Sequence, residues 1–295
     1  MRIRARAGRF RNQEEAKPGE LVSTFDRPIS ASHSLRAYIP AAGHRLFSSS
    51  DTMAAEAPRL NCMGKPVDAP EATNSVVRPV SNAEKQARVR ELMSASSGNS
   101  WDECWKEGMT PWDVGGVTPV IQHLVEQGEL PQGRALVPGC GSGYDVLALA
   151  SEFRQVVGLD ISETASSQAK KNAEQHPRGK WVQFIVDDFF TYTPESPFNL
   201  IFDYTFFCAL EPELRPKWAS KMAELLSSDG ELLTLMFPID DFAGGPPFAL
   251  SVEAYEKVLI PQGLMLVSCE ENEFSVPARK GKEKIARWKK SSSKM

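Results

Sequence analysis

A short run of glycines is the part of the sequence best suited to binding a ligand. Gly139-Cys140-Gly141-Ser142-Gly143 directly follows residues 134–138, an apolar run with the composition of a buried strand. Glycines at a strand-to-helix turn let the backbone bend sharply and approach a ligand closely. Asp160 closes the next apolar run, where a carboxylate can accept hydrogen bonds from both hydroxyls of a ribose. The pattern predicts a cofactor that contains adenosine, and replacing Asp160 is expected to leave the fold intact.

The spacing of the glycines indicates which cofactor this is. A dinucleotide site requires G-x-G-x-x-G, but Tyr144 occupies the third glycine position and Gly143 comes one residue early. S-adenosylmethionine has no pyrophosphate to place at a helix terminus, so it fits better than a nicotinamide dinucleotide. A turn without a ligand and a non-catalytic nucleotide-binding module remain alternatives.

Asp187-Asp188-Phe189 ends the third apolar run, where a carboxylate could accept from the adenine amino group and Phe189 could lie on the ring. The alternative there is a solvated acidic turn.

Three tryptophans precede the first apolar run. Trp101 and Trp105 are one helical turn apart, and Trp112 follows Thr110-Pro111, which ends any helix. A cation is attracted to the face of an aromatic ring, so the cluster could cover a sulfonium. Packing in the core or in a flap is the alternative.

Short apolar runs alternate with helical patterns along the rest of the chain. The expected strands are 134–138, 155–161, 181–186, 199–204, 231–237, 264–269 and 284–288. The expected helices include 82–94, 215–226 (closed by Asp229-Gly230) and 252–259. This alternation predicts an α/β fold with a mostly parallel sheet and helices on both faces. The last two strands have no helix between them, which predicts an antiparallel pair.

Composition excludes several classes of protein. The chain has 295 residues and a formal net charge of −4, so neither nucleic-acid nor membrane binding is expected. No apolar stretch approaches the ~18 residues of a membrane-spanning helix. The five cysteines include no C-x-x-C pair and the four histidines are dispersed, so no metal site and no disulfide framework are expected.

Residues 1–80 differ in composition from the rest. Five arginines precede the first acid, Glu14, and Pro, Ser, Ala and Gly then dominate. The segment is interpreted as a disordered leader or as a transit segment, with 81–295 as the folded domain. A cytoplasmic protein is expected on the first interpretation, and a chloroplast or mitochondrial one on the second. Met53 resembles an alternative translation start.

Five motifs together resemble the plant halide and thiol methyltransferases of the thiopurine methyltransferase family. They are WxxCWxxxxTPWDxG, ALVPGCGSGYDV, VVGLDIS, LIFDYTFFCAL and RKGKEKIARWK, within residues 101–290. The resemblance implies a class I, Rossmann-like fold and S-adenosylmethionine as cofactor. It also implies which residues contact the cofactor: Trp101, Trp105, Trp112, Gly139, Asp160, Asp188, Phe189 and Tyr204. The chain has Phe237 where relatives often show tyrosine. Apart from the resemblance, residues 279–284 are interpreted as solvated charges at the start of a strand.

The expected reaction is in-line methyl transfer to a small soft nucleophile: a halide, bisulfide, thiocyanate or thiol. Such nucleophiles need no dedicated base, which agrees with the scarcity of histidine. The expected pocket walls are Trp105, Tyr204, Phe206 and Phe207, with the Tyr204 hydroxyl as the catalytic group that orients the substrate.

An amino-nitrogen methyltransferase is the alternative within the class. Such enzymes carry D/N-P-P-Y/F after the fourth strand, whereas this chain has Asp203-Tyr204-Thr205-Phe206 there and Pro246-Pro247-Phe248 one strand too late. The expected partner is a small anionic or thiol substrate, bound by a monomer.

Overall fold

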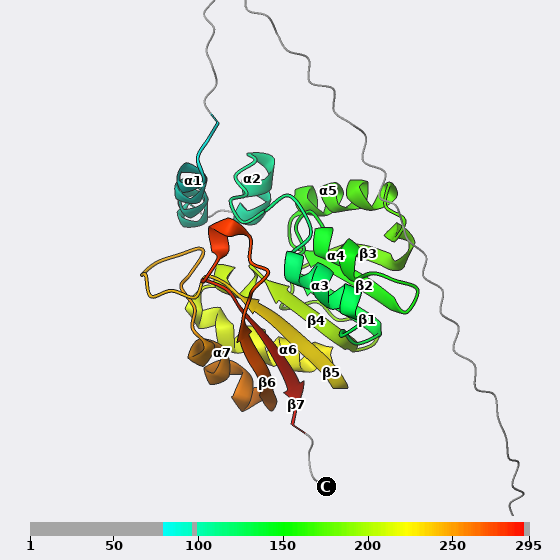
Figure 1. Cartoon of the computed structure of the whole chain (residues 1–295). Helices are drawn as coiled ribbons and strands as arrows, with labels where there is room; N and C mark the ends of the chain where they lie inside the picture. The colour runs from blue at the N-terminus through cyan, green and yellow to red at the C-terminus, as the bar shows by residue number, and fades with distance from the viewer. Residues whose placement is uncertain (1–78, 96–98, 292–295) are drawn as a thin grey trace, which may run out of the picture. The chain divides into compact units, whose positions relative to one another are not determined.

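A seven-stranded sheet forms the centre of the molecule (Figure 1). The computed structural model describes residues 79–95 and 99–291 of the chain. The strands are β1 (Gly133–Pro138), β2 (Arg154–Asp160), β3 (Val182–Val186), β4 (Phe198–Tyr204), β5 (Leu226–Met236), β6 (Leu264–Glu271) and β7 (Lys284–Lys290). Their order is β3-β2-β1-β4-β5-β7-β6, and β7 alone runs opposite to the other six strands. The predicted parallel sheet and the antiparallel pair near the C-terminus are confirmed.

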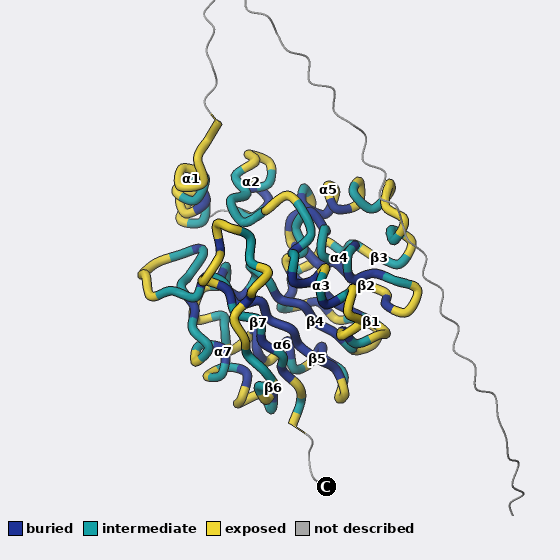
Figure 2. The backbone as a smooth tube through the Cα atoms, in the orientation of Figure 1, coloured by how far each residue is buried: buried dark blue, intermediate teal, exposed yellow. Residues whose placement is uncertain are grey.

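Helices cover both faces of the sheet because the central strands are apolar on both sides. Side chains alternate between the faces of a strand. Ala135 and Val137 of β1 therefore pack with helices α3 (Pro119–Gln127) and α4 (Tyr144–Leu149), which lie on the same side as α5 (Glu163–Glu174). Leu136 points the other way, into the larger core beneath α6 (Arg215–Leu225) and α7 (Val252–Leu259). In Figure 2 the central strands are mostly buried, as two apolar faces require.

One predicted boundary is wrong. Asp229-Gly230 does not close helix α6, which ends at Leu225, and Leu226 already pairs with Phe198 of β4. Gly230 lies inside β5 at an irregular register, where a Cβ would come within 2.9 Å of the Phe198 carbonyl oxygen. Gly230 is therefore required for the close approach of β4 and β5. An Asp-Gly pair at such an approach looks the same in the sequence as an Asp-Gly pair that ends a helix.

In the described part of the chain, helices α1 (Asn82–Ser94) and α2 (Ser100–Lys106) come before α3 and the first strand. Helix α1 begins with a capping box, in which the Ser81 hydroxyl accepts from the Glu84 N–H and the Glu84 carboxylate accepts from the Ser81 N–H. Residues 1–78, and with them almost all of the predicted leader, lie outside the described residues. Within residues 79–95 and 99–291, no helix is long and apolar enough to cross a membrane.

Candidate functional site

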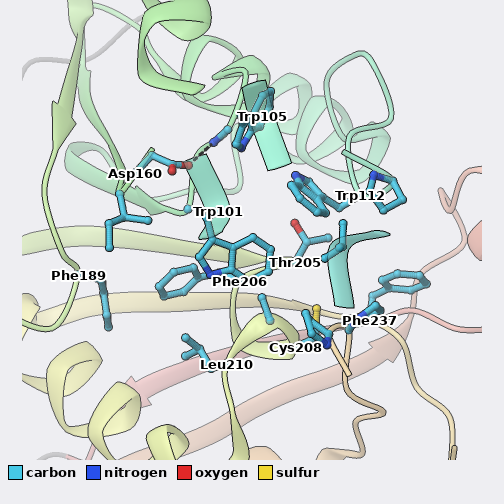
Figure 3. Close-up of a pocket in the computed structure, with 18 of the residues that line it drawn as sticks. Trp101, Trp105, Trp112, Asp160, Phe189, Thr205, Phe206, Cys208, Leu210 and Phe237 are labelled. Carbon is cyan, nitrogen blue, oxygen red and sulfur yellow. Dashed lines mark hydrogen bonds between the residues drawn. The ribbon is translucent and has the colours of Figure 1, made fainter. Parts of the chain in front are cut away.

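A cavity of about 450 Å³ lies beyond the carboxyl ends of β1, β2 and β4. Figure 3 shows Asp160 and Phe189 at one end and Trp112, Phe237 and Cys208 at the other. We call these the Asp160 end and the Phe237 end. Seven of the eight predicted cofactor residues line the cavity: Trp101, Trp105, Trp112, Gly139, Asp160, Asp188 and Phe189. In an open α/β sheet, this edge is where ligands bind.

Backbone conformation and close neighbours favour glycine at two positions of the turn. Gly139 has a φ of 59°, and a Cβ there would lie 2.6 Å from the Phe206 ring. Gly141 has a φ of 52°, and a Cβ there would lie 3.1 Å from the Trp105 indole. Both positions are in the left-handed region that side chains disfavour. The turn thus presents bare backbone to the cavity, which is the cradle that an adenosine cofactor needs.

Asp160 is held in place by the backbone around it. Its Oδ2 accepts from the Gly141 N–H and its Oδ1 from the Ser162 N–H, both at 2.9 Å. Burial raises the pKa of this carboxyl, and the two N–H donors oppose that shift. Each carboxylate oxygen can accept more than one hydrogen bond. Asp160 can therefore still accept from the two hydroxyls of a ribose, and the residues present fit S-adenosylmethionine.

Buried Asp102 attaches the tryptophan helix α2 to the start of α5. It accepts from the Ser162 hydroxyl at 2.7 Å and from the Thr164 N–H at 2.9 Å, and it pairs with Lys106 at 2.9 Å. Burial opposes ionisation, but these donors lower the pKa of Asp102 well below its usual range. Because Ser162 also donates its N–H to Asp160, helix α2 and the Asp160 carboxylate share one hydrogen-bonded cluster.

The third tryptophan is attached to the glycine turn. Asp113 accepts from the Ser142 hydroxyl at 2.6 Å, and Asp145 accepts from both the N–H and the hydroxyl of Thr118. The ring of Trp112 packs edge-on against the other two indoles, with centroid distances of 5.4 Å to Trp101 and 6.3 Å to Trp105. The three indoles therefore form one aromatic cluster on the cavity wall.

The acidic turn after β3 lies on the same wall. Phe189 is buried and packs edge-on against Phe206 at 5.1 Å. Asp188 accepts from the Phe190 N–H, which fixes the turn, and Asp187 also lines the cavity. The predicted adenine contacts are thus adjacent to Asp160.

Of the expected pocket walls, Tyr204 does not line the main cavity and Phe207 lines neither cavity. Tyr204 lines a small neighbouring cavity beside the glycine turn. Its hydroxyl accepts a hydrogen bond from Arg279 and donates one to Glu283. Burial raises the pKa of that hydroxyl well above its usual range. Phe207 is fully buried against Trp218, so the prediction that it forms a pocket wall is wrong.

The reason for the error at Phe207 is the left-handed backbone conformation of Thr205. This residue has a φ of 59°, a strained conformation for a β-branched side chain, and it lines both cavities. The Phe207 N–H then donates to Asp203 at 3.2 Å, so Phe206 faces the cavity and its neighbour faces the core.

The interpretation of residues 279–284 as solvated charges is wrong for two of them. Arg279 and Glu283 are 5% and 2% exposed, and Arg279 lines the cavity. The stretch turns inward because Arg279 is bonded to the Trp112 carbonyl and to Tyr204. Local charge density alone could not have distinguished this residue from exposed Lys280.

Other wall residues carry no signal in the sequence. Asn82, Gln86 and Val89 of α1 line the cavity, as do Pro246 and Pro247 after β5 and Cys208 after β4. They come from segments far apart in the chain. Among the residues that the structure describes, no group of three or more His, Cys, Asp or Glu side chains could hold a metal ion.

The fold is that of S-adenosylmethionine-dependent methyltransferases. The 1,6-didemethyltoxoflavin-N1-methyltransferase of Burkholderia thailandensis superposes with a TM-score of 0.53 at 16% identity, covering 77% of this chain and 94% of that one. The CcbJ methyltransferase of Streptomyces caelestis gives 0.52 at 15% identity, covering 65% and 96%. At these identities the likeness shows the fold alone.

Sequence comparison then shows the family. The thiopurine S-methyltransferase family model matches residues 96–294, and the chain belongs to this family. A probable thiol methyltransferase 2 of Arabidopsis thaliana is 58% identical over 202 residues, covering 68% of this chain and 89% of the relative. Thiocyanate methyltransferase 1 of Brassica oleracea is 56% identical over 190 residues, covering 64% and 84%. The chain is an S-adenosylmethionine-dependent methyltransferase, as its motifs predict.

Proposed function

We propose that this enzyme methylates a small soft nucleophile: a halide, bisulfide, thiocyanate or thiol. S-adenosylmethionine, when bound, supplies a methyl group on a positively charged sulfur. The names of the two similar plant proteins agree with this acceptor class. The observation that carries the proposal is the lack of a proton acceptor at the Phe237 end of the cavity, within the described residues.

The titratable groups of the cavity support this reading. Its three carboxylates lie on the side of the predicted adenosine contacts: Asp160 ends β2, and Asp187 and Asp188 follow β3. At the Phe237 end, burial raises the pKa of the Cys208 thiol to about 12, so this group stays protonated at neutral pH. No histidine lines the cavity in the described part of the chain. A nucleophile that already carries its electron pair needs none of these groups as a base.

We assign the cofactor contacts as the family pattern suggests. Asp160 would hold the ribose, Asp188 and Phe189 the adenine, and Gly139 would give close backbone approach. Trp101, Trp105 and Trp112 would surround the sulfonium with aromatic faces. Tyr204 would contact the cofactor from the small cavity beside the glycine turn. It would do so through its ring, because its hydroxyl already donates a hydrogen bond to Glu283. Together these residues orient the acceptor and exclude water, which favours a reaction in which charge is neutralised.

The test is a headspace and chromatographic assay with S-adenosylmethionine and iodide, bromide, bisulfide, thiocyanate and an aryl thiol. Rates with iodide and thiocyanate should be nearly independent of pH around neutrality, because these anions do not titrate there. Rates with bisulfide or the thiol should follow the thiolate fraction of each substrate. A protein base would instead impose one inflection on all substrates. A shared inflection would contradict the base-free reaction, and the absence of every product with cofactor bound would favour an amino-nitrogen acceptor.

We further propose that residues 81–295 act as a monomeric methyltransferase domain behind the leader 1–80. A cytoplasmic location is our expectation, with the chloroplast or mitochondrion as the alternative if the leader is a transit segment. Sedimentation would test the oligomeric state. A fusion of residues 1–80 to a fluorescent protein would test targeting, and a diffuse cytosolic signal would contradict the transit interpretation.

A further inference from the structure

Arg279 is a buried cation on the wall of the substrate cavity. It ends the short 3-10 helix Pro277–Arg279 in the connection between β6 and β7 and is only 5% exposed. Its Nη2 donates to the Trp112 carbonyl at 2.6 Å, and its Nη1 donates to the Tyr204 hydroxyl. Its side chain is therefore fixed between the tryptophan loop and the end of β4.

The positive charge of this guanidinium has no direct counterion. Among the described residues, no carboxylate forms an ion pair with Arg279; the Tyr204 hydroxyl lies between it and Glu283. Glu283 is in turn fixed by the Asn272 side-chain amide, which donates to it at 2.8 Å. Two aromatic faces flank the cation, with centroid distances of 4.5 Å for Phe237 and 5.1 Å for Tyr204. Rings stabilise a cation without neutralising it.

A buried charge without a partner is costly, so such a group is expected where an anion completes the site. An arginine has five N–H donors, and only those to Tyr204 and Trp112 are accounted for in the described part of the chain. Arg279 lines the main cavity together with Phe237 and Ala278, but it does not line the small cavity around the glycine turn. It is thus placed at the Phe237 end, apart from the backbone cradle at Gly139 and Gly141.

We propose that Arg279 is the anion-binding residue of the acceptor subsite, and that Tyr204 and Glu283 are positioning residues that hold it there. This rests on the proposed function and deepens it. The subsite selects nucleophiles that carry a negative charge, such as thiocyanate, a halide or a thiolate, over neutral sulfur compounds of similar size. In this arrangement the Tyr204 hydroxyl acts through the guanidinium and does not itself orient the substrate.

The test measures binding as well as turnover, on the full chain loaded with S-adenosylhomocysteine. Thiocyanate is the anionic probe and thiourea the neutral soft-sulfur probe, each titrated by calorimetry into wild type, Arg279→Met and Lys280→Met. Lys280 is exposed and adjacent, so its variant removes the same charge outside the cavity. Arg279→Met should weaken thiocyanate binding by about 10- to 100-fold, the range for loss of a charge-assisted hydrogen bond. Thiourea and S-adenosylhomocysteine affinities should change by less than about twofold, and Lys280→Met should resemble wild type.

Two further variants test the proposal even if Arg279→Met fails to fold. Arg279→Lys keeps the charge and should retain part of the preference for thiocyanate over thiourea, even if Arg279→Met does not fold. Tyr204→Phe removes only the bridging hydroxyl, and it should raise KM for thiocyanate more than it lowers kcat.

Unchanged thiocyanate binding in Arg279→Met, or none in wild type, would overturn the proposal. So would a loss confined to S-adenosylhomocysteine affinity, which would place Arg279 on the cofactor instead. These results are separable from failure of the proposed function, which is decided by whether wild type methylates the panel of nucleophiles at all.

Discussion

Replacing Asp160 with alanine should weaken cofactor binding and also reduce stability. The sequence alone suggested that a carboxylate at the end of a strand could be removed without harm to the fold. In the structure the side chain is 8% exposed and accepts from the N–H groups of Gly141 and Ser162. An unsatisfied buried donor costs about 1–3 kcal/mol, so Asp160→Ala should lower the free energy of unfolding by roughly that amount or more.

The effect on binding has a separate origin. A ribose would lose both of its acceptors and would face a glycine turn no longer anchored through Gly141. Charge-assisted hydrogen bonds contribute about 1.5–3 kcal/mol, which corresponds to a loss of about 10- to 150-fold in affinity for S-adenosylhomocysteine. Calorimetry well below the melting temperature measures this loss, and urea unfolding measures the stability of the same protein.

Ser162→Ala is the matched control for this experiment. Its hydroxyl is fully buried, accepts from the Ala165 N–H and donates to Asp102, so its removal should cost about 1–2 kcal/mol of stability. The Asp160 carboxylate and its backbone donors remain. We therefore expect a destabilised protein that binds S-adenosylhomocysteine nearly as wild type does. Wild-type affinity in folded Asp160→Ala, or an equal loss in both variants, would refute the assignment of Asp160 to the ribose.

Three other changes test the turn, the leader and a buried acid. Gly139→Val should abolish S-adenosylhomocysteine binding in calorimetry, because its Cβ would collide with the Phe206 ring at 2.6 Å; binding by a folded variant would contradict the cradle. Deleting residues 1–80 should leave turnover and melting temperature nearly unchanged, whereas deleting 1–98 removes the α1 wall of the cavity and should reduce turnover. Burial raises the pKa of Asp145 to about 6, above the value of about 3.9 expected in the unfolded chain. The folded state then holds the proton more tightly, so this contribution to stability is present below pH 4 and is lost as the pH rises through 6. Between pH 4 and pH 6, the free energy of unfolding of wild type should fall by on the order of 1–3 kcal/mol relative to that of Asp145→Asn, as measured by melting curves at each pH. The same pH dependence in both proteins would contradict the raised pKa of Asp145.

The Asp160 end of the cavity was predictable because it is specified locally. Each of its carboxylates and glycines directly follows a strand, and parallel strands end at one edge of the sheet. An apolar run followed by Gly139, or one that ends in Asp160, therefore fixes a place in three dimensions before any packing is known. The tryptophans are attached to this edge through Asp102 and Asp113, which accept from the hydroxyls of Ser162 after β2 and Ser142 in the glycine turn after β1.

Other side chains of the cavity were not predictable, because their directions depend on long-range contacts. Phe206 and Phe207 are adjacent and chemically alike, yet the positive φ of Thr205 sends one to the cavity and the other to the core. Arg279 and Lys280 are likewise adjacent and equally charged. Only the arginine turns inward, because its partners Trp112 and Tyr204 arrive from distant parts of the chain.

The two ends of the cavity are carried by different parts of the fold, so substitutions can change one end without the other. The Asp160 end, the proposed cofactor side, is built largely from backbone groups and strand ends, so altering it disturbs the turns after β1 and β2, as the two N–H donors to Asp160 illustrate. The Phe237 end, the proposed acceptor subsite, is lined by side chains of the segment after β5 and of the connection from β6 to β7. Such connections tolerate substitution better than the strands they join. Exchanging Arg279 or Phe237 should therefore change which nucleophile is methylated while cofactor affinity is preserved, and the separation of the two effects follows from where each group is attached to the fold.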